Sequence, residues 1–218
     1  MSVRGGPTAE SYDRVKHRGP ARVAELAARV GVGRLTYVSH MLAAPDAGAA
    51  ALRAKFHAEQ AITTSAVPST IFRPTYRMET LPRQVRGSRA VVLGRQPYPF
   101  HMLAAADFAR MVSRALTTPE SAGQRLDVHG PEALTIADAL RAYCARLAPD
   151  TRVVTRPLWF MTLLNRTALR GQLRGTLELM RVLQRSGERG DPSQANRLPG
   201  APMTTLLQWC EQRRIASS

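Results

Sequence analysis

The sequence predicts an α/β fold in which a parallel sheet is followed by a mostly helical C-terminal lobe. Residues 34–76 carry the main observations. Two short apolar runs, LTYV and TIF, end at Ser39 and at Arg73–Pro74, and each reads as a buried strand. Between them, Leu52 begins an apolar stripe at helical spacing. Strand, helix and strand in this order form the repeating unit of a parallel sheet.

The ends of these two strands are the first candidate site. Ligands of open α/β sheets bind outside the carboxyl ends of the strands. Ser39 and Pro74 occupy those ends. The helix between the strands carries Lys55 on a second stripe, which it shares with Glu59.

The remaining elements follow from the same patterns. Gly31 and Gly33 end a helix and precede a strand, so they are turn residues, because a phosphate-binding glycine loop opens a helix after a strand. Residues 1–150 are expected to form the sheet-containing part and 151–218 the helical lobe of one continuous unit. We expect helices at 12–30, 51–64, 78–84, 105–116, 135–147 and 206–213, and one or two helices within 157–186. Strands are expected at 89–93, 125–129 and 152–155, and loops at 94–101 and 187–202.

The charge of the chain is unusual. Its 218 residues carry a formal net charge of +15, which raises the possibility of a nucleic-acid partner. All but two of its 31 basic residues are arginines, however, and these are spread over the whole chain. No nucleic-acid-binding module accompanies them. The sequence therefore predicts no nucleic-acid partner.

Other function classes are set aside by residue spacing. Cys144 and Cys210 lie far apart and are expected to be reduced core thiols. The five histidines show no ligand spacing, so no metal site is predicted. No run reaches the roughly 18 apolar residues of a membrane span, and the first ten residues lack the apolar segment of a signal peptide. We expect a cytoplasmic protein with no membrane partner.

Several segments together resemble one protein superfamily. YVSH, ALRAKFHAEQAI, TIFRP, LAAADFA and GPEALT follow one another within residues 37–135. In this order they resemble the short-chain dehydrogenase/reductase superfamily, and more specifically its atypical, NmrA-like branch of NAD(P)-binding Rossmann proteins. The resemblance covers most of residues 10–150.

The resemblance implies a cofactor and its site. It implies NAD(P) as the cofactor, with Ser39, Lys55, Pro74, Thr75 and Tyr76 as the binding residues. Lys55 would hold the ribose hydroxyls, and residues 73–76 would present backbone groups to the nicotinamide amide. Lys55 can also be read as a solvated surface lysine, and Ser39 as a residue that only satisfies the backbone at a strand end.

Two departures from the superfamily change the expected activity. The catalytic pattern of the superfamily places a tyrosine four residues before the lysine, but here that position holds Ala51. The catalytic residues are therefore unknown, and Ser39 and Lys55 are weak candidates. The glycine-rich loop that binds the pyrophosphate has no counterpart. We expect an N-terminally truncated Rossmann-like sheet, impaired cofactor binding, and self-association through an exposed sheet edge.

Two functions remain open at this point. The first is an NAD(P)-dependent oxidoreductase of the atypical type, which would need a proton donor other than the usual tyrosine. The second is a non-catalytic, NmrA-like module that senses redox state or binds a protein partner. The sequence does not choose between NAD and NADP, nor does it name a small-molecule substrate or a protein partner.

Overall fold

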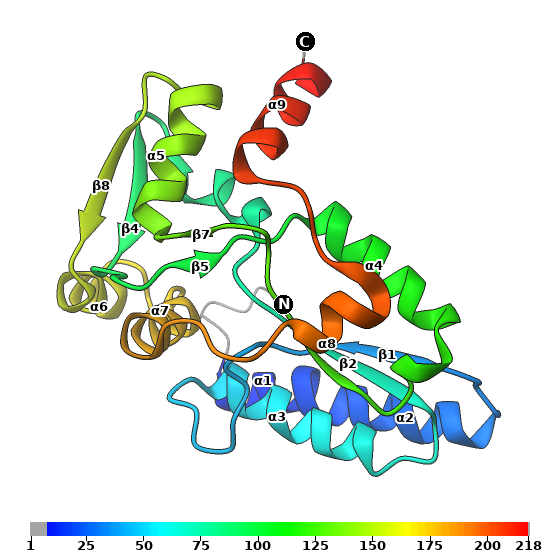
Figure 1. Cartoon of the computed structure of the whole chain (residues 1–218). Coiled ribbons are helices and arrows are strands. Elements are labelled where there is room, and N and C mark those ends of the chain that lie inside the picture. The colour runs from blue at the N-terminus through cyan, green and yellow to red at the C-terminus, as the bar shows by residue number, and fades with distance from the viewer. Residues whose placement is uncertain (1–7, 218) are drawn as a thin grey trace.

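A three-stranded parallel sheet lies at the base of the molecule. The computed structural model describes residues 8–217, with side chains to residue 215. Strands β1 (Leu35–Val38), β2 (Ser69–Pro74) and β6 (Arg125–Val128) pair in the order β1-β2-β6. Val38 pairs with Phe72 and Pro74 with Val128, so the carboxyl ends of the three strands meet at one edge (Figure 1). The predicted strand–helix–strand unit is confirmed.

Helices cover both faces of this sheet, and successive residues of β2 point to opposite faces. Ile71 packs with Ala24 and Ile62 of helices α2 (Gly19–Arg29) and α3 (Ala50–Thr63). On the other face, Phe72 packs with Phe108 of helix α4 (Ala105–Thr117). Because both faces are covered, β2 is buried along almost its whole length, with only Arg73 partly exposed.

The N-terminal helical stretch precedes β1. Helix α1 (Ala9–Asp13) continues through a π-helical turn, Arg14–Arg18, into α2. Gly31 follows α2 with φ of +69°, a conformation that glycine adopts at low cost. The assignment of this glycine to a turn is therefore confirmed.

A second layer of strands lies beside the first. Strand β4 (Arg89–Leu93) pairs antiparallel with β3 (Val85–Arg86) and parallel with β8 (Arg152–Arg156). Strands β5 (Phe100–His101) and β7 (Ala133–Leu134) form a separate antiparallel pair. Helix α5 (Ile136–Leu147) contacts β4, β7 and β8, and helix α9 (Leu206–Ser217) packs on α5. Strand β8 pairs with β4, so residues on both sides of position 150 share a sheet. The division of the chain into a sheet-containing part, 1–150, and a helical lobe, 151–218, stays a prediction.

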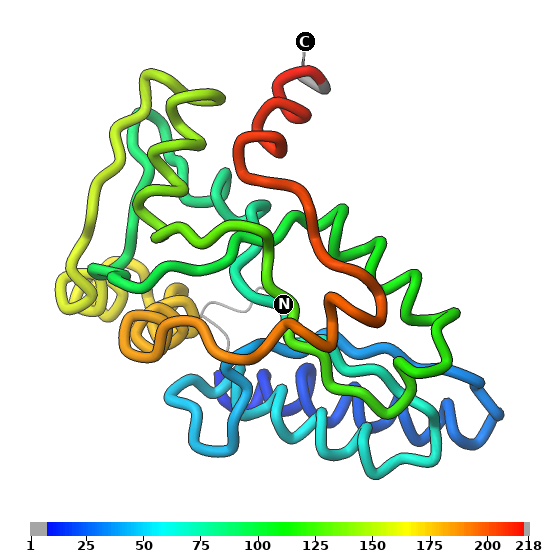
Figure 2. Tube along the Cα trace, viewed as in Figure 1, coloured from blue at the N-terminus to red at the C-terminus, as the bar shows by residue number. Residues whose placement is uncertain are grey.

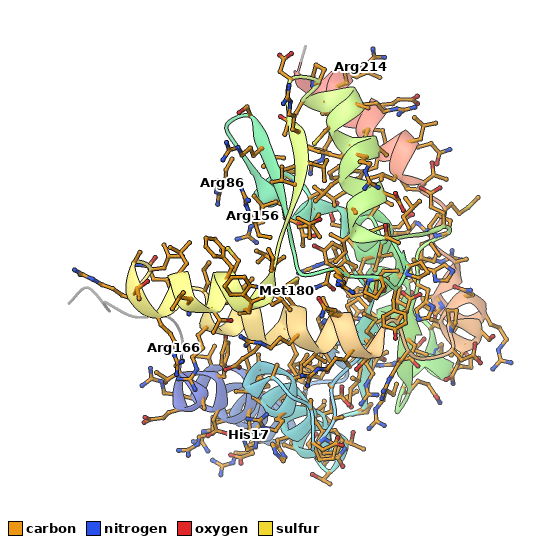
Figure 3. All side chains as sticks on the ribbon, turned by 90° about the vertical axis from the view of Figure 1, so that its left-hand side faces the viewer. His17, Arg86, Arg156, Arg166, Met180 and Arg214 are labelled. Atoms are coloured by element: carbon orange, nitrogen blue, oxygen red, sulfur yellow. The ribbon has the colours of Figure 1, made fainter. Side chains whose placement is uncertain are left out.

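Two further helices connect the layers. Helices α6 (Leu158–Thr167) and α7 (Arg174–Ser186) lie between the β4–β8 layer and the α1–α3 layer (Figure 3). Met180 of α7 lies toward the β4–β8 layer. Residues 187–202 then return past the parallel sheet and include the short helix α8 (Ser193–Ala195) and a π-helical turn, Asn196–Gly200 (Figure 2).

Four sequence expectations need correction. Residues 78–84 form two 3₁₀ turns, Met78–Thr80 and Pro82–Gln84, because Pro82 cannot donate the bond that a continuous helix requires. The loops expected at 94–101 and 187–202 contain β5 and α8 respectively. Within residues 8–217, the strands also form two sheets and a separate pair in place of one sheet. No helix among residues 8–217 combines the length and the apolar character needed to cross a membrane.

A buried ion pair joins α3 to the parallel sheet. Both carboxylate oxygens of Glu59 accept hydrogen bonds from Arg73, at 2.9 and 2.6 Å. Arg125 of β6 lies 3.3 Å from the same carboxylate. The side chain of Glu59 is 0% exposed, and its carboxylate forms ion pairs with these two guanidinium groups, one from β2 and one from β6.

Replacing Glu59 by glutamine should therefore lower the free energy of unfolding by about 3 kcal/mol, because it leaves a half-buried guanidinium without its carboxylate. Urea denaturation measures the change. Glu25→Gln is the matched control, since Glu25 pairs with Arg22 on the surface, and it should cost less than about 1 kcal/mol. Equal losses in the two variants would contradict the role given to Glu59.

Candidate cofactor site

Ser39 and Lys55 come together at the carboxyl end of β1. The backbone N–H of Ser39 donates to Phe72 at 2.7 Å, which holds the end of β1 against β2. The Ser39 hydroxyl is buried, and no hydrogen-bond partner for its oxygen is found among the described residues. Lys55 Nζ donates to the carbonyl oxygen of Val38, the residue before Ser39, at 2.6 Å. The end of β1 thus carries a buried hydroxyl with unused bonding capacity, and an ammonium group is bonded to the backbone one residue before it.

Burial and several neighbouring cations set the pKa values of the groups around Ser39 and Lys55. Burial lowers the pKa of Lys55 to about 8, repulsion from Lys16 and Arg77 adds to this effect, and attraction to Glu59 opposes it. Burial likewise lowers the pKa of His40 to about 4, with Lys55 among the charges that contribute. His40 is therefore neutral at pH 7, and its Nδ1 accepts the N–H of Leu42 at 3.1 Å.

The missing phenol is not replaced by a neighbouring tyrosine. Ala51 lies on α3 one turn before Lys55, as the sequence predicts. Tyr37 is close, with Lys55 Nζ 5.4 Å from its ring centroid, but its hydroxyl donates to the Lys16 carbonyl at 3.3 Å. Burial and the nearby Glu59 raise the pKa of Tyr37 to about 12. A group with that pKa is a poor proton-transfer partner near neutral pH.

The three predicted residues after Arg73 lie at the end of β2, and their side chains are already engaged. Pro74 ends β2 and pairs with Val128. The Thr75 hydroxyl donates to Glu188, and the Tyr76 hydroxyl accepts from Gln84 at 2.6 Å. The structure therefore brings Ser39 and Lys55 together. The backbone N–H of Thr75 and the carbonyl oxygen of Tyr76 are also bonded, to Val128 and Leu103 respectively.

A cavity of about 400 Å³ opens at the same edge of the sheet. It lies between the loop that follows β1, the ends of β2 and β6, and the end of α7, and among its lining residues are Arg73, Asp127 and Arg189. Burial raises the pKa of Asp127, although a hydrogen bond from Asp191 opposes the effect. A carboxyl group with a raised pKa in a cleft is a candidate functional group. Sequence analysis missed Asp127, because only its pairing in β6 brings it to this cavity.

The segment after α7 closes over the strand ends. The backbone N–H of Asp191 donates to Asp127 at 3.3 Å, and Gly190 has φ of +100°. A Cβ at Gly190 would lie 2.5 Å from Asp127 Cγ, so this close passage requires glycine. The same segment brings Glu188 to His101 and His129, a cluster that residue spacing did not reveal.

The pyrophosphate half of a dinucleotide fits this site less well. Pyrophosphates bind where a glycine-rich loop leads from a strand into a helix N-terminus. The helix that follows β1 is α3, and its first N–H group, that of Ala50, already faces the Glu178 carboxylate at 3.4 Å. A phosphate there would meet a negative charge. The described residues therefore do not fit a pyrophosphate at α3.

The unusual basicity of Lys55 can be tested directly, because Lys16 and Lys55 are the only lysines in the chain. With lysine labelled by ¹³C at Cε, the resonance of Lys55 should titrate with a midpoint of about 8. Lys16→Arg assigns the remaining signal to Lys55. A midpoint near the ordinary lysine value of about 10.4 would contradict the burial described above.

Sequence comparison finds a reductase among curated proteins. The (4-alkanoyl-5-oxo-2,5-dihydrofuran-3-yl)methyl phosphate reductase of Streptomyces griseus subsp. griseus is 36% identical over 143 residues. The match covers 64% of this chain and 48% of the reductase, so the chain spans about half the length of this relative. No protein-family model matches the chain.

Structural comparison extends over most of the chain. An NADPH-dependent quinone oxidoreductase from Escherichia coli, complexed with NADPH, has a TM-score of 0.70 at 18% identity and covers 89% of this chain and 70% of its own. A nucleoside-diphosphate-sugar epimerase from Staphylococcus aureus has a TM-score of 0.70 at 13% identity, covering 94% and 81%. The Citrobacter triphenylmethane reductase complexed with NADP(H) has a TM-score of 0.65 at 14% identity, covering 94% and 80%. The chain therefore shares the Rossmann-like α/β fold of these two reductases and the epimerase.

Proposed function

We propose that this chain is an NAD(P)-binding protein of the atypical short-chain dehydrogenase/reductase type, whose contact with the cofactor lies at Ser39 and Lys55. The observation that carries the proposal is the buried Ser39 hydroxyl, which has no partner among the described residues and directly follows Val38, whose carbonyl oxygen accepts a hydrogen bond from the Lys55 ammonium group. Ribose hydroxyls are suitable partners for both groups. The similarity to NADP(H)-bound reductases supports the choice of a nicotinamide cofactor.

The 218-residue chain should nevertheless hold the cofactor weakly. Much of the affinity for a dinucleotide comes from its pyrophosphate, which a glycine-rich loop and a helix dipole bind together. The described residues contain no such loop between a strand and a helix, and Glu178 occupies the N-terminus of α3. Only the nicotinamide–ribose part of the cofactor is then bound well.

If the protein reduces a substrate, Asp127 is the group that we propose in place of the absent tyrosine. Ala51 has no proton to transfer, and Tyr37 is held away by its bond to Lys16. Asp127 lines the cavity at the strand ends, and burial raises its pKa above the ordinary carboxyl value. The substrate of such a reaction is not assigned.

Titration calorimetry with NADPH tests cofactor binding. We expect a dissociation constant of about 1 mM or weaker for the wild-type chain. Lys55→Gln and Ser39→Val should weaken binding further by at least about tenfold, since each removes a hydrogen bond to the ribose. Arg22→Gln, which changes an exposed cation on α2, is the control for net charge and should bind as the wild type does.

A dissociation constant in the micromolar range would contradict the proposed weak binding. Equal weakening by Arg22→Gln and Lys55→Gln would contradict the site itself, since binding would then depend on the general positive charge of the chain and not on this corner.

The second function, an interaction module without catalysis, is favoured by the open edge of β1. Among residues 8–217, β1 pairs only with β2. The helix beside this edge exposes Val23 at 54% and Leu26 at 44%, and an apolar cavity of about 390 Å³ between α2 and β1 includes Val23 and Leu35 in its lining. Unpaired strand edges next to apolar surface favour pairing with another chain. We propose that copies of this chain associate through this edge.

Light scattering coupled to size-exclusion chromatography measures the association. The wild-type chain should show a mass above 23.9 kDa that rises with concentration. Val23→Glu should shift it toward the monomer, because it places a charge beside the edge of β1. Leu116→Glu, at a half-exposed apolar position on α4, should not. A wild-type monomer at all concentrations would contradict this proposal.

A further inference from the structure

Two histidines and a glutamate from three separate parts of the chain meet beside the parallel sheet. His101 ends β5, His129 follows β6, and Glu188 lies in the segment after α7. One potential ligand atom from each residue lies within 4.8 Å of those of the other two. Two imidazoles and one carboxylate are a ligand set that proteins use for zinc and for divalent iron.

The hydrogen bond of His129 orients this ring toward the glutamate. His129 Nε2 lies 3.2 Å from the backbone carbonyl oxygen of Arg189. A carbonyl oxygen only accepts, so Nε2 carries the proton, and in neutral His129 the lone pair is on Nδ1. That nitrogen lies 3.8 Å from Glu188 Oε2. A lone pair and a carboxylate thus face each other, and an added proton or a metal cation would stabilise the arrangement.

His101 converges on the same carboxylate oxygen. Its Nδ1 is hydrogen-bonded to Glu188 Oε2, and its ring stacks on that of His129 with the centroids 5.4 Å apart. A metal at this position would replace the hydrogen bond, and neutral His101 would then carry its proton on Nε2. The ligand atoms of a tetrahedral zinc site lie about 3.3 Å apart, given bonds of 2.0–2.2 Å. Small movements of the His129 and His101 rings reach that spacing.

The surroundings hold the carboxylate in place. Glu188 accepts from the Thr75 hydroxyl and, at 3.1 Å, from the backbone N–H of His101. Such second contacts fix the orientation of metal ligands in proteins. The side chains of Glu188 and His129 are 12% and 10% exposed, whereas that of His101 is 41% exposed, so the cluster is buried on one side and open on the other.

A cavity borders both imidazoles. It has a volume of about 380 Å³, and both His101 and His129 line it. Three protein ligands next to an open space are typical of metal sites that keep a position for water or substrate.

We propose that His101, His129 and Glu188 bind a divalent transition-metal cation of the zinc type, with a remaining coordination position available to a small molecule in the adjoining cavity. This site is separate from Ser39 and Lys55, and its metal affinity does not depend on nucleotide binding. It differs from the expectation that the chain has no metal ligands, which rested on spacing along the sequence alone.

Metal titration of the tag-free chain, after removal of metals with EDTA, tests the proposal. Calorimetry with zinc chloride should give one equivalent bound with a dissociation constant of about 1 μM or tighter. Cobalt(II) should give the visible absorption of a site of low coordination number, without the thiolate charge-transfer band that Cys144 or Cys210 would produce.

Three single variants locate the site. His101→Gln, His129→Gln and Glu188→Gln should each weaken zinc binding by at least about tenfold. His57→Gln removes an exposed histidine of α3 and should leave it unchanged. Circular dichroism establishes whether each variant is folded, and for any variant that is not, the cobalt spectrum of the wild-type chain decides.

The proposal is overturned if the wild-type chain binds no zinc saturably, if folded Glu188→Gln binds as tightly as the wild type, or if cobalt shows thiolate ligands. A rise in the wild-type unfolding temperature with zinc concentration supports it, because a ligand of the folded state stabilises that state. The absence of that rise counts against it.

Discussion

The ion pair between Glu59 and Arg73 is the interaction on which the rest of the parallel layer depends. It fixes α3 against β2 by two hydrogen bonds to one fully buried carboxylate. Arg125 extends the same charge cluster to β6. Lys55 lies one turn before Glu59 on the same helix, so the position of its ammonium group at the end of β1 follows from the pair. Removing the carboxylate would loosen the site as well as the fold.

The parallel arrangement of the strands, which this ion pair stabilises, explains why the candidate functional groups lie at one edge of the sheet. The parallel register brings the ends of β1, β2 and β6 to one side, and residues 187–191 close over them through Glu188, Gly190 and Asp191 (Figure 2). The candidate cofactor contacts, the Asp127 cavity and the histidine–glutamate cluster all lie along this edge. Different parts of the chain supply them, and the topology makes them neighbours.

The parallel unit could be predicted from the sequence because its signals are local. The apolar runs of β1 and β2 and the stripe of α3 depend on residues near one another in the chain, and the resemblance to atypical reductases adds their order. The burial of Glu59 is a feature that such local patterns do not predict. Glu59 shares a helical stripe with Lys55, yet it is buried, because arginines 14 and 66 residues further along the chain neutralise it. Asp127 and the two histidines were missed for the same reason. Pro82 lies in a 3₁₀ turn, and residues 193–200 form a short helix and a π-helical turn. Apolar periodicity does not predict elements this short.

The claim that the corner of Ser39 and Lys55 holds the nicotinamide end of a cofactor is tested most directly by mapping NADPH binding with ¹H–¹⁵N NMR, which detects weak complexes residue by residue. The account predicts that shift changes concentrate on the amides of Ser39, Lys55, Thr75 and Tyr76 and persist at moderate salt. Because the chain carries a net charge of +15, an anionic nucleotide could also associate with its arginines in general. Changes spread over outlying arginines such as Arg152 and Arg156 of β8, and lost as salt is raised, would contradict the account.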